Sequence, residues 1–399
     1  MNKNVYVAGV GIISAIGNNV TETILSFEKH YSGIALVEYL ATKHRNEFPL
    51  GEVKLSNKDL AEQNKLDPCL SRTILLSYHA AKEAIQFLSK HVFKNFRIGF
   101  ISANSVGGMD KTESFYTDFL NDSNSGDLRN VMYHDCGKAT DYVAQKLEIN
   151  DFITTISTAC SSSANAILLG CRMIKADQLD IVVAGGVDSL TKFTLNGFNS
   201  LMIVDKEQCR PLDKSRMGLN LGEGAAYLVL MSDKAIKALN PDVLCKISGY
   251  HNANDSYHQT ALSDEGNGPY LAMEGALKMS GLQPSQISYI NMHGTGTQNN
   301  DSSEGKAVER LFHPDYPKLS STKSFTGHTL GSSGAIEAVF SSLAIKHGLI
   351  FPNFSFTEAV AGLHLIPESY FQKGIQLEHV LSNSFGFGGN CTSLLFSKN

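Results

Sequence analysis

The chain has 399 residues, of which 42% are hydrophobic and 18% charged, and its formal net charge is -5 at pH 7. This composition excludes a disordered or fibrous chain, and the acidic balance lacks the footprint of a protein that binds nucleic acid. No run of about 18 uninterrupted apolar residues is present, so we expect no membrane span. The glycine-broken apolar N-terminus predicts a first strand and turn, not a signal peptide.

Short apolar runs alternate with helical patterns along the whole chain. The runs predict buried strands at 5–11, just before Cys160, and at 98–104, 180–186, 226–231, 246–250, 287–292, 379–385 and 392–397. A helical face after Cys160 comprises Ile167, Leu168, Cys171 and Ile174. A second face after Gly334 comprises Ile336, Val339, Phe340 and Leu343. This alternation predicts an α/β protein, and a connector at 237–243 separates two comparable halves.

The cysteines argue for a reducing compartment. Their number is odd and none forms a C-x-x-C pair: Cys69, Cys136, Cys160, Cys171, Cys209, Cys245 and Cys391. Neither a disulfide framework nor a zinc site is indicated. We therefore expect free thiols and a cytoplasmic protein with no bound metal.

Cys160 lies between a predicted strand and a helix rich in serine and alanine. That position places its sulfur at a helix N-terminus, where unpaired N–H groups and the helix dipole favour the thiolate. The alternative is a buried structural cysteine, which is the more common role of the residue and the one that we assign to Cys171.

His293 and His328 lie in turns rich in glycine and threonine at strand ends, where functional residues of α/β folds gather. Lys323 precedes His328 by five residues. Either histidine alone could be structural, but two of them with a cysteine at a helix start form a set suited to thiol chemistry. The run from Asp301 to Glu304 resembles a capping box and predicts that a helix begins there.

The loop from Asn383 to Asn390 carries three glycines between and after two phenylalanines. Glycines let a backbone approach a ligand and present its N–H groups, although a tight turn between the last two strands would also need them. The glycines near Gly9 do not complete a dinucleotide-binding fingerprint, because Ser14 occupies the third position.

Five collinear motifs together resemble the β-ketoacyl-acyl carrier protein synthases of the thiolase-fold superfamily. They are STACSSS (157–163), RPLDKSRMGLNLGEGAAYLVL (210–230), HGTGT (293–297), KSFTGHTLGSSGAIEA (323–338) and NSFGFGG (383–389). The motif spellings lean towards ketosynthases of polyketide or polyene pathways. The resemblance implies a five-layered αβαβα fold built from two similar halves, residues 1–240 with the cysteine and residues 241–399 with the histidines. It also implies a homodimer, or a heterodimer with a related ketosynthase-like subunit.

The resemblance assigns a role to each matching residue. Cys160 is the acyl-accepting nucleophile, and His293 and His328 bind the malonyl thioester carbonyl. The backbone N–H groups of Cys160 and Phe387 form the oxyanion hole, and Phe387 gates the acyl pocket. Lys323 fixes the neighbourhood of His328 electrostatically, and Val106 lines the end of the pocket. The supporting residues are Glu337, Thr295, Thr297 and Phe385.

The activity implied is that of a 3-oxoacyl-ACP synthase. An acyl group moves to Cys160, and decarboxylative Claisen condensation with malonyl-ACP then extends it by two carbons. The substrates are carried on the phosphopantetheine of acyl carrier protein, and no bound cofactor is needed.

Two alternatives remain open at this point. A non-catalytic chain-length-factor-like partner typically lacks the cysteine, and a CoA-dependent thiolase uses a second cysteine near its C-terminus. Cys391 stands near the C-terminus but in a synthase-type loop, and a thiol of ordinary pKa is a poor base. Carrier docking is another open point, because few basic residues are present where related enzymes have several: Lys65, Arg72, Lys82 and, elsewhere, Arg210.

Overall fold

The computed structural model describes residues 3–89 and 91–399. The strands are β1 (Val5–Ser14), β2 (Ile98–Ala103), β3 (Phe152–Ile156), β4 (Ile181–Asp188), β5 (Gly224–Ser232), β6 (Cys245–Asn254), β7 (Tyr289–Asn291), β8 (Lys318–Ser320), β9 (His379–Phe385) and β10 (Asn390–Ser397). The α-helices are α1 (Val20–Glu28), α2 (Asn57–Asn64), α3 (Arg72–Ile85), α4 (Val92–Asn95), α5 (Met109–Asn121), α6 (Cys136–Lys146), α7 (Ser162–Lys175), α8 (Lys192–Ser200), α9 (Asp233–Leu239), α10 (Asn267–Ser280), α11 (Gln298–Phe312), α12 (Lys323–Thr326) and α13 (Ser333–His347). Short 3₁₀ turns are η1 (Leu128–Tyr133), η2 (Pro284–Gln286), η3 (Leu330–Ser332) and η4 (Phe387–Gly389).

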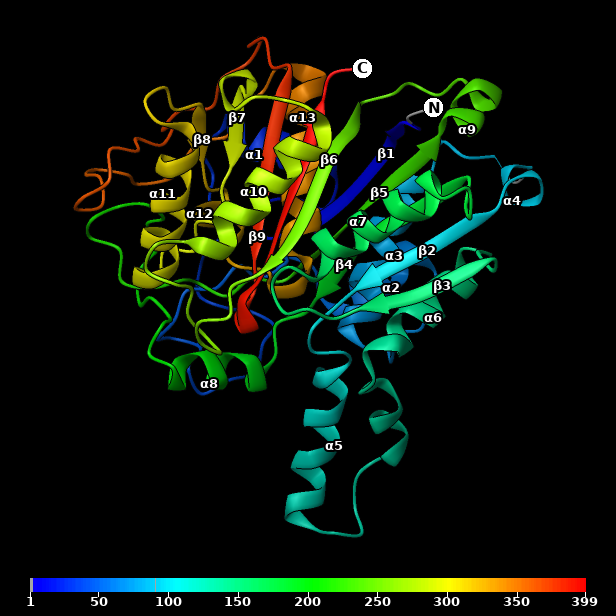
Figure 1. The fold of residues 1–399 in the computed structure, drawn as a ribbon. Coiled ribbons are helices and arrows are strands. Elements are labelled where there is room, and N and C mark those ends of the chain that lie inside the picture. Colours follow the sequence, from blue (N-terminus) through cyan, green and yellow to red (C-terminus); the bar gives the residue numbers. More distant parts are fainter. Residues whose placement is uncertain (1–2, 90) are drawn as a thin grey trace.

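The strands form one sheet in the order β3-β2-β4-β5-β1-β6-β10-β9-β7-β8. This order is a mirror image about the β1–β6 contact, since the first five strands and the last five occupy matching places. The directions match as well: β2 is parallel to β3 and β4, and β7 is parallel to β8 and β9. The two halves therefore share one topology, as the comparable halves of the sequence predicted (Figure 1).

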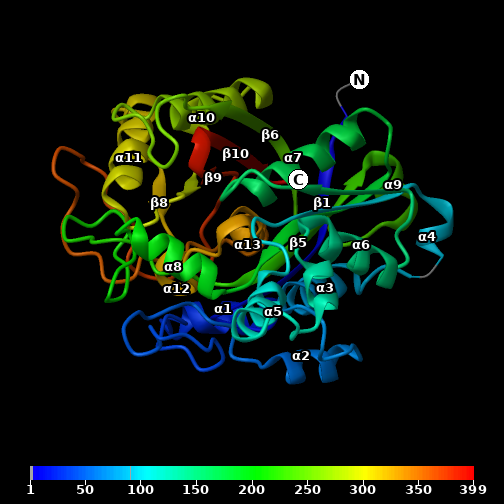
Figure 2. The ribbon, with the colours of Figure 1, turned by 90° about the horizontal axis from the view of Figure 1, so that it is seen from below.

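Helices fill both sides of each half-sheet. α7 and α13 pack with both halves in a central apolar cluster. A second cluster joins α3 and α6 to strands of the first half, and a third joins α10 and α11 to strands of the second. Figure 2 shows α13 in the middle of the molecule, with α10 and α11 on one side and α3 on the other. With each half-sheet counted as one layer, the layers alternate helix, sheet, helix, sheet, helix. This arrangement confirms the thiolase-like α/β fold.

The central helix α13 is buried on all sides from Ser333 to Ile345. A helix in such a place must satisfy its own polar groups. The Ser341 and Ser342 hydroxyls do so by donating to the carbonyls one turn earlier, at 2.8 Å each. The serines of α13 therefore do not prevent the helix from lying in the central layer. A helix packed on all sides also gives the residues at its N-terminal end a rigid support.

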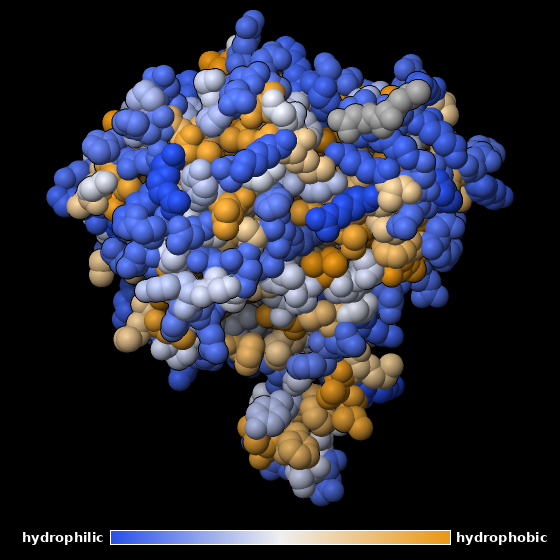
Figure 3. All heavy atoms as spheres, in the orientation of Figure 1, coloured by the Kyte–Doolittle hydropathy of each residue, from blue (hydrophilic) through white to orange (hydrophobic). Residues whose placement is uncertain are grey.

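One segment projects from this body. α5 and η1 form an arm that extends downwards in Figure 1, and no residue of α5 is buried. Figure 3 shows hydrophobic residues gathered on the arm. The exposed large hydrophobic side chains of this segment are Tyr116, Phe119, Leu120, Leu128, Val131 and Met132. Exposed apolar patches of this kind mark interaction surfaces.

Most predicted elements are present with shifted ends. The strand predicted at 5–11 continues to Ser14, and the predicted connector at 237–243 starts inside α9, which runs to Leu239. The capping-box prediction is wrong, because the helix begins at Gln298 and Asp301 and Glu304 lie inside it. Among residues 3–89 and 91–399, no helix has both the length and the apolar character needed to cross a bilayer.

Candidate active site

Cys160 follows β3 and lies directly before α7, where the sequence placed it. The residue before it, Ala159, has a φ of 53°, a left-handed conformation that costs energy for a residue with a side chain. The cysteine is buried, with 5% of its surface exposed. A strained turn that ends at a buried sulfur is the kind of local distortion that concentrates at reaction centres.

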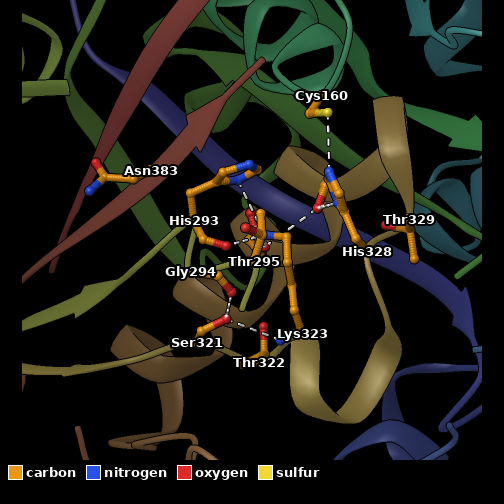
Figure 4. Close-up of polar contacts among 12 residues, drawn as sticks. Cys160, His293, Gly294, Thr295, Ser321, Thr322, Lys323, His328, Thr329 and Asn383 are labelled. Carbon is orange, nitrogen blue, oxygen red and sulfur yellow. Dashed lines mark hydrogen bonds and ion pairs between the residues drawn. The ribbon is translucent and has the colours of Figure 1, made fainter. Parts of the chain in front are cut away.

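An imidazole lies at hydrogen-bonding distance from the sulfur. Sγ of Cys160 lies 3.1 Å from Nε2 of His328, a contact marked by a dashed line in Figure 4. His328 lies in the turn between α12 and η3, and its Nδ1 is 3.4 Å from the hydroxyl of Ser333. The two ends of the ring thus face a sulfur and a hydroxyl, and both of these groups can exchange a proton with it.

His293 completes the group from the other side. It follows β7, and its ring centroid is 5.3 Å from that of His328 at an interplanar angle of 85°. Phe385 packs 5.7 Å from the His293 ring. The three residues predicted as the catalytic group, from three distant parts of the chain, therefore lie together around one point (Figure 4).

Lys323 fixes the position of His293 through two polar contacts. Its ammonium donates to the carbonyl of His293 at 2.6 Å, lies 3.2 Å from Nδ1 of the same residue and forms an ion pair with Glu337. An ammonium can only donate, so Nδ1 of His293 must accept and the ring proton lies on Nε2. The sequence analysis placed Lys323 beside His328, whereas its direct contacts are with His293 and Glu337, and only its charge acts on His328.

Burial and this ammonium set the charge state of the rings. Removal from water lowers the pKa values of His293 and His328 well below the ordinary 6.5, and the positive charge of Lys323 lowers both further. Both imidazoles are therefore neutral at pH 7. Burial also raises the pKa of Glu337 to about 7, against the opposing effect of Lys323.

The expected thiolate at Cys160 needs correction. Burial raises the pKa of this thiol to about 11, and the Lys323 charge and the Phe387 backbone N–H lower it only in part. The helix N-terminus was the reason to expect a thiolate, but loss of water around a buried sulfur outweighs it. The resting residue is a thiol with a neutral imidazole beside it.

Two backbone donors point at the sulfur. The N–H groups of Phe387 and of Cys160 itself both interact with Sγ. Gly386 lets the final loop approach, because a Cβ there would lie 2.8 Å from the carbonyl oxygen of Thr158 and 3.2 Å from the amide nitrogen of Cys160. The two backbone N–H groups therefore come together at the sulfur from two separate segments, and their role as oxyanion donors stays a prediction.

Two acidic side chains that the sequence analysis did not assign to the site shape the loop after His293. Glu304 accepts the N–H groups of His293 and Gly294 at 2.9 and 2.8 Å, and Asp301 accepts that of Thr295 at 2.9 Å. Burial raises the pKa of Glu304 to about 7. In the same loop the hydroxyls of Thr295 and Thr297 lie 2.9 Å apart. In the sequence, the two carboxylates that follow the histidine motif were the signal that could have assigned them to the site.

Two cavities meet at Cys160. One of about 240 Å³ is lined by residues of the site and its loops, including His293, His328, Thr295, Thr297 and Phe385. The other, of about 340 Å³, is mainly apolar and includes Val106, Leu201 and Leu330 in its wall. Phe198 and Phe387 line both, and their rings stack with centroids 5.7 Å apart. Phe198 and Phe387 therefore lie between two cavities that are both lined by Cys160.

Other candidate residues lie outside this site. Cys391 is fully buried in an apolar cluster with Leu262, Ala272 and Phe385, and burial raises its pKa. Arg72 forms a buried bidentate ion pair with Glu223 at 2.6 and 2.8 Å, so this member of the few basic residues considered for carrier docking does not lie free on the surface.

The remaining docking candidates differ in surroundings. Lys65 and Lys82 are exposed, whereas Arg210 lies within 4.0 Å of Asp205 and 3.5 Å of Glu207. Within residues 3–89 and 91–399, no three His, Cys, Asp or Glu side chains are grouped so that they could hold a metal ion.

Two family models match the chain. The model described as Beta-ketoacyl synthase, N-terminal domain, covers residues 2–235, and the model described as Beta-ketoacyl synthase, C-terminal domain, covers residues 244–357. Among curated proteins, 3-oxoacyl-[acyl-carrier-protein] synthase 2 of Staphylococcus aureus strain COL is 30% identical over 417 aligned residues, which span 100% of this chain and 99% of that protein.

Solved structures agree. The structure of the ketosynthase (ApeO) in complex with its chain length factor (ApeC) from Xenorhabdus doucetiae matches with a TM-score of 0.85 and 28% identity, over 100% of this chain and 98% of that chain. The ishigamide ketosynthase/chain length factor matches with a TM-score of 0.93 over 100% of both chains, at 24% identity, and thus supports the fold.

Proposed function

The chain belongs to the β-ketoacyl synthase family, and we propose that Cys160, His293 and His328 carry out its condensation chemistry. The enzyme is a 3-oxoacyl-ACP synthase, an acyltransferase that joins an acyl group to a malonyl-derived unit on acyl carrier protein. The single observation that carries the residue assignment is the position of Sγ of Cys160, 3.1 Å from Nε2 of His328 and beside the His293 ring in a buried cavity.

In the first step, Cys160 takes the acyl group from the carrier thioester. The thiol proton moves to Nε2 of His328, and the sulfur attacks the carbonyl carbon. The oxygen then bears a negative charge, which the N–H groups of Cys160 and Phe387 stabilise. The phosphopantetheine thiol leaves with the proton, and the acyl chain enters the apolar cavity beside Val106. Covalent transfer of this kind predicts ping-pong kinetics.

In the second step, malonyl-ACP loses CO₂. The electron pair of the broken carbon–carbon bond forms an enolate on the thioester, and the Nε2 proton of His293 is placed to bind its oxygen. His328 supplies a second donor when its proton lies on Nε2, a role open to a neutral imidazole. The enolate carbon attacks acyl-Cys160 and the carbon–sulfur bond breaks, which leaves the 3-oxoacyl product on the carrier. The sulfur of Cys160 is the leaving group, and it takes up a proton from solvent to restore the thiol. No bound cofactor enters this scheme.

The alternatives are weaker on particular residues. A non-catalytic chain-length-factor-like partner does not need a cysteine with an imidazole at hydrogen-bonding distance. A thiolase needs a second thiol at the reacting centre, whereas Cys391 is buried in the apolar cluster that contains Phe385 and lines neither of the two cavities at Cys160.

The partners and the organisation of the chain follow from this assignment. Acyl carrier protein is the substrate-bearing partner, and we assign the exposed apolar residues of the arm to contact with a second ketosynthase-like subunit. We also place the two functional halves at residues 1–240 and 241–399, which the mirrored strand order supports. Seven free cysteines support a cytoplasmic location.

The experiment is stepwise acylation followed by intact-protein mass spectrometry. Acyl-ACP should add one acyl group to the wild-type protein and none to Cys160→Ala. The matched control is Cys391→Ala, which removes another buried thiol and should still be acylated. Addition of malonyl-ACP should then clear the adduct and yield 3-oxoacyl-ACP. An adduct on Cys160→Ala, or cleavage of acetoacetyl-CoA without decarboxylation, would contradict the proposal.

A further inference from the structure

Asn390 connects the final loop to the segment that bears the nucleophile. Its side-chain oxygen accepts hydrogen bonds from Ser161 Oγ at 2.7 Å, from Asn165 Nδ2 at 2.8 Å and from Asn252 Nδ2 at 2.8 Å. These donors belong to two different elements, the start of α7 and strand β6. One oxygen with three donors is a fixed point that resists movement of any of them.

Both segments of the oxyanion hole are attached to this point. Ser161 is the residue after Cys160, and its single hydroxyl proton is shared between Asn390 Oδ1 and the carbonyl oxygen of Thr158, which lies 2.8 Å away. On the other side, the carbonyl of Asn390 accepts the N–H of Gly386 at 2.8 Å, which closes the short loop that holds Phe387. The two backbone donors come from segments far apart in the sequence, and Asn390 is bonded to both of these segments.

We propose that Asn390 is a positioning residue that holds the N–H groups of Cys160 and Phe387 at the separation needed to bind the oxyanion. This role rests on the proposed function and adds a residue to it. An oxyanion hole works because its donors are already in place when charge develops. Loss of the Asn390 oxygen would free the loop from α7 and leave three donors without their common acceptor.

The same polar cluster offers a matched control. Thr392 Oγ1 donates to Asn165 Oδ1 at 2.9 Å and accepts from Asn252 Nδ2 at 2.8 Å, and it bonds neither Ser161 nor Asn390. Thr392→Val therefore disturbs the cluster without cutting the link between the loop and α7. A residue that only stabilises the fold would act like Thr392.

The test compares two reactions of one sulfur. Acylation by acyl-ACP develops an oxyanion, whereas alkylation by iodoacetamide does not. Asn390→Ala should slow acylation about 10- to 100-fold, a part of what loss of an oxyanion donor costs, and change alkylation less than about threefold. Thr392→Val should leave both rates near those of the wild type. The melting temperature of each variant is measured alongside.

Ser161→Ala gives a second route that keeps Asn390. It removes one hydroxyl from the same link and should slow acylation in the same selective way. If both residues act through their shared bond, the double variant should be little slower than Asn390→Ala alone. The inference is overturned if Asn390→Ala acylates at the wild-type rate, if acylation and alkylation fall together, or if Thr392→Val shows the same selective loss.

The outcomes separate this inference from the proposed function. If the wild-type protein is alkylated at Cys160 but takes no acyl group from any acyl-ACP, the proposed function fails. If the wild type is acylated and Asn390→Ala is acylated equally fast, the inference alone fails. Should Asn390→Ala not fold, the Ser161→Ala rates and their comparison with Thr392→Val decide the question.

Discussion

Cys160 Sγ lies 3.1 Å from His328 Nε2, although 168 residues separate the two in the sequence. Each residue alone has an ordinary structural explanation, a buried cysteine or a buried histidine. At this distance the pair gives a thiol with a raised pKa an acceptor for its proton, while His293 lies beside the His328 ring, with the two ring centroids 5.3 Å apart. The different distances of the two histidines from the sulfur lead to different predictions for each.

His293→Ala should separate the two half-reactions. The ring is held by Lys323 with its Nε2 proton free, and we assign that proton to the enolate oxygen. Decarboxylation of malonyl-ACP should fall about 10²- to 10³-fold, as for loss of one oxyanion donor, while acylation of Cys160 changes less than about fivefold. His328→Ala should slow both steps. Rapid-quench assays of CO₂ release and of the acyl adduct measure them, and equal losses in His293→Ala would refute the assignment.

The reactivity of Cys160 should keep rising to an unusually high pH. Burial raises its folded-state pKa to about 11, so the thiolate fraction grows up to that pH and does not level off near 9. Alkylation by iodoacetamide, followed from pH 6 to about pH 11 by peptide mapping, measures the profile. The exposed Cys69 in the same sample is the internal control. A plateau for Cys160 near pH 9 or below would contradict this prediction.

Lys323→Met should destabilise the protein by an amount that depends on pH. The change leaves Glu337 buried without its cation, a loss worth about 3–5 kcal/mol when the carboxylate stays charged. Burial has already raised the folded-state pKa of Glu337 to about 7, above its value in the unfolded chain. Between these two pKa values the folded protein holds a proton that the unfolded chain releases, so the stability of the protein falls as the pH rises. The variant, with a still higher pKa, should lose more at pH 8.5 than at pH 6.

Urea unfolding at the two pH values measures this difference. Glu337→Gln in the same background removes the unpaired charge and should restore part of the stability, mainly at the higher pH. A Lys323→Met variant with the same loss at both pH values would show that the ion pair is not the cause.

Val106→Phe should shorten the acyl chains that the enzyme accepts. Val106 lines the apolar cavity that also borders Cys160, and a larger side chain would occupy part of its 340 Å³. Acylation by a long-chain acyl-ACP should fall about tenfold relative to a short-chain one, in line with the cost of displaced methylenes. Val106→Ala is the control for loss of the native side chain. An unchanged ratio of long to short substrates would place the acyl chain elsewhere.

The sequence predicted the fold well where elements are long and periodic. The strands around Val183, Leu228 and Leu394 are buried apolar runs, and a buried strand needs such a run. β8 was not predicted, because three residues cannot show an alternating pattern. The halves were recognised as similar, but the mirrored order depends on strand pairings between distant residues, which no local pattern contains.

The sequence predicted which residues form the site, but not how deeply they are buried or what surrounds them. Cys160, His293, His328 and Lys323 stand in distinctive motifs, whereas the burial that raises the thiol pKa depends on packing from both halves. Glu304 was assigned to a helix cap, since a capping box and a buried loop-binding carboxylate have the same local sequence. Arg72 was counted only as one of the few basic residues near the docking segment, and the fold reveals its buried partner Glu223.

The mirrored strand order explains how a thiol from one half of the chain comes to face an imidazole from the other half. Cys160 follows β3 and precedes α7, and His328 follows β8 and precedes α13, so they hold equivalent positions in the two halves. Two identical half-chains packed in this way would set each residue against its own copy. Covalent fusion lets one position hold a thiol and its counterpart an imidazole, a pairing of donor with acceptor that strict symmetry forbids.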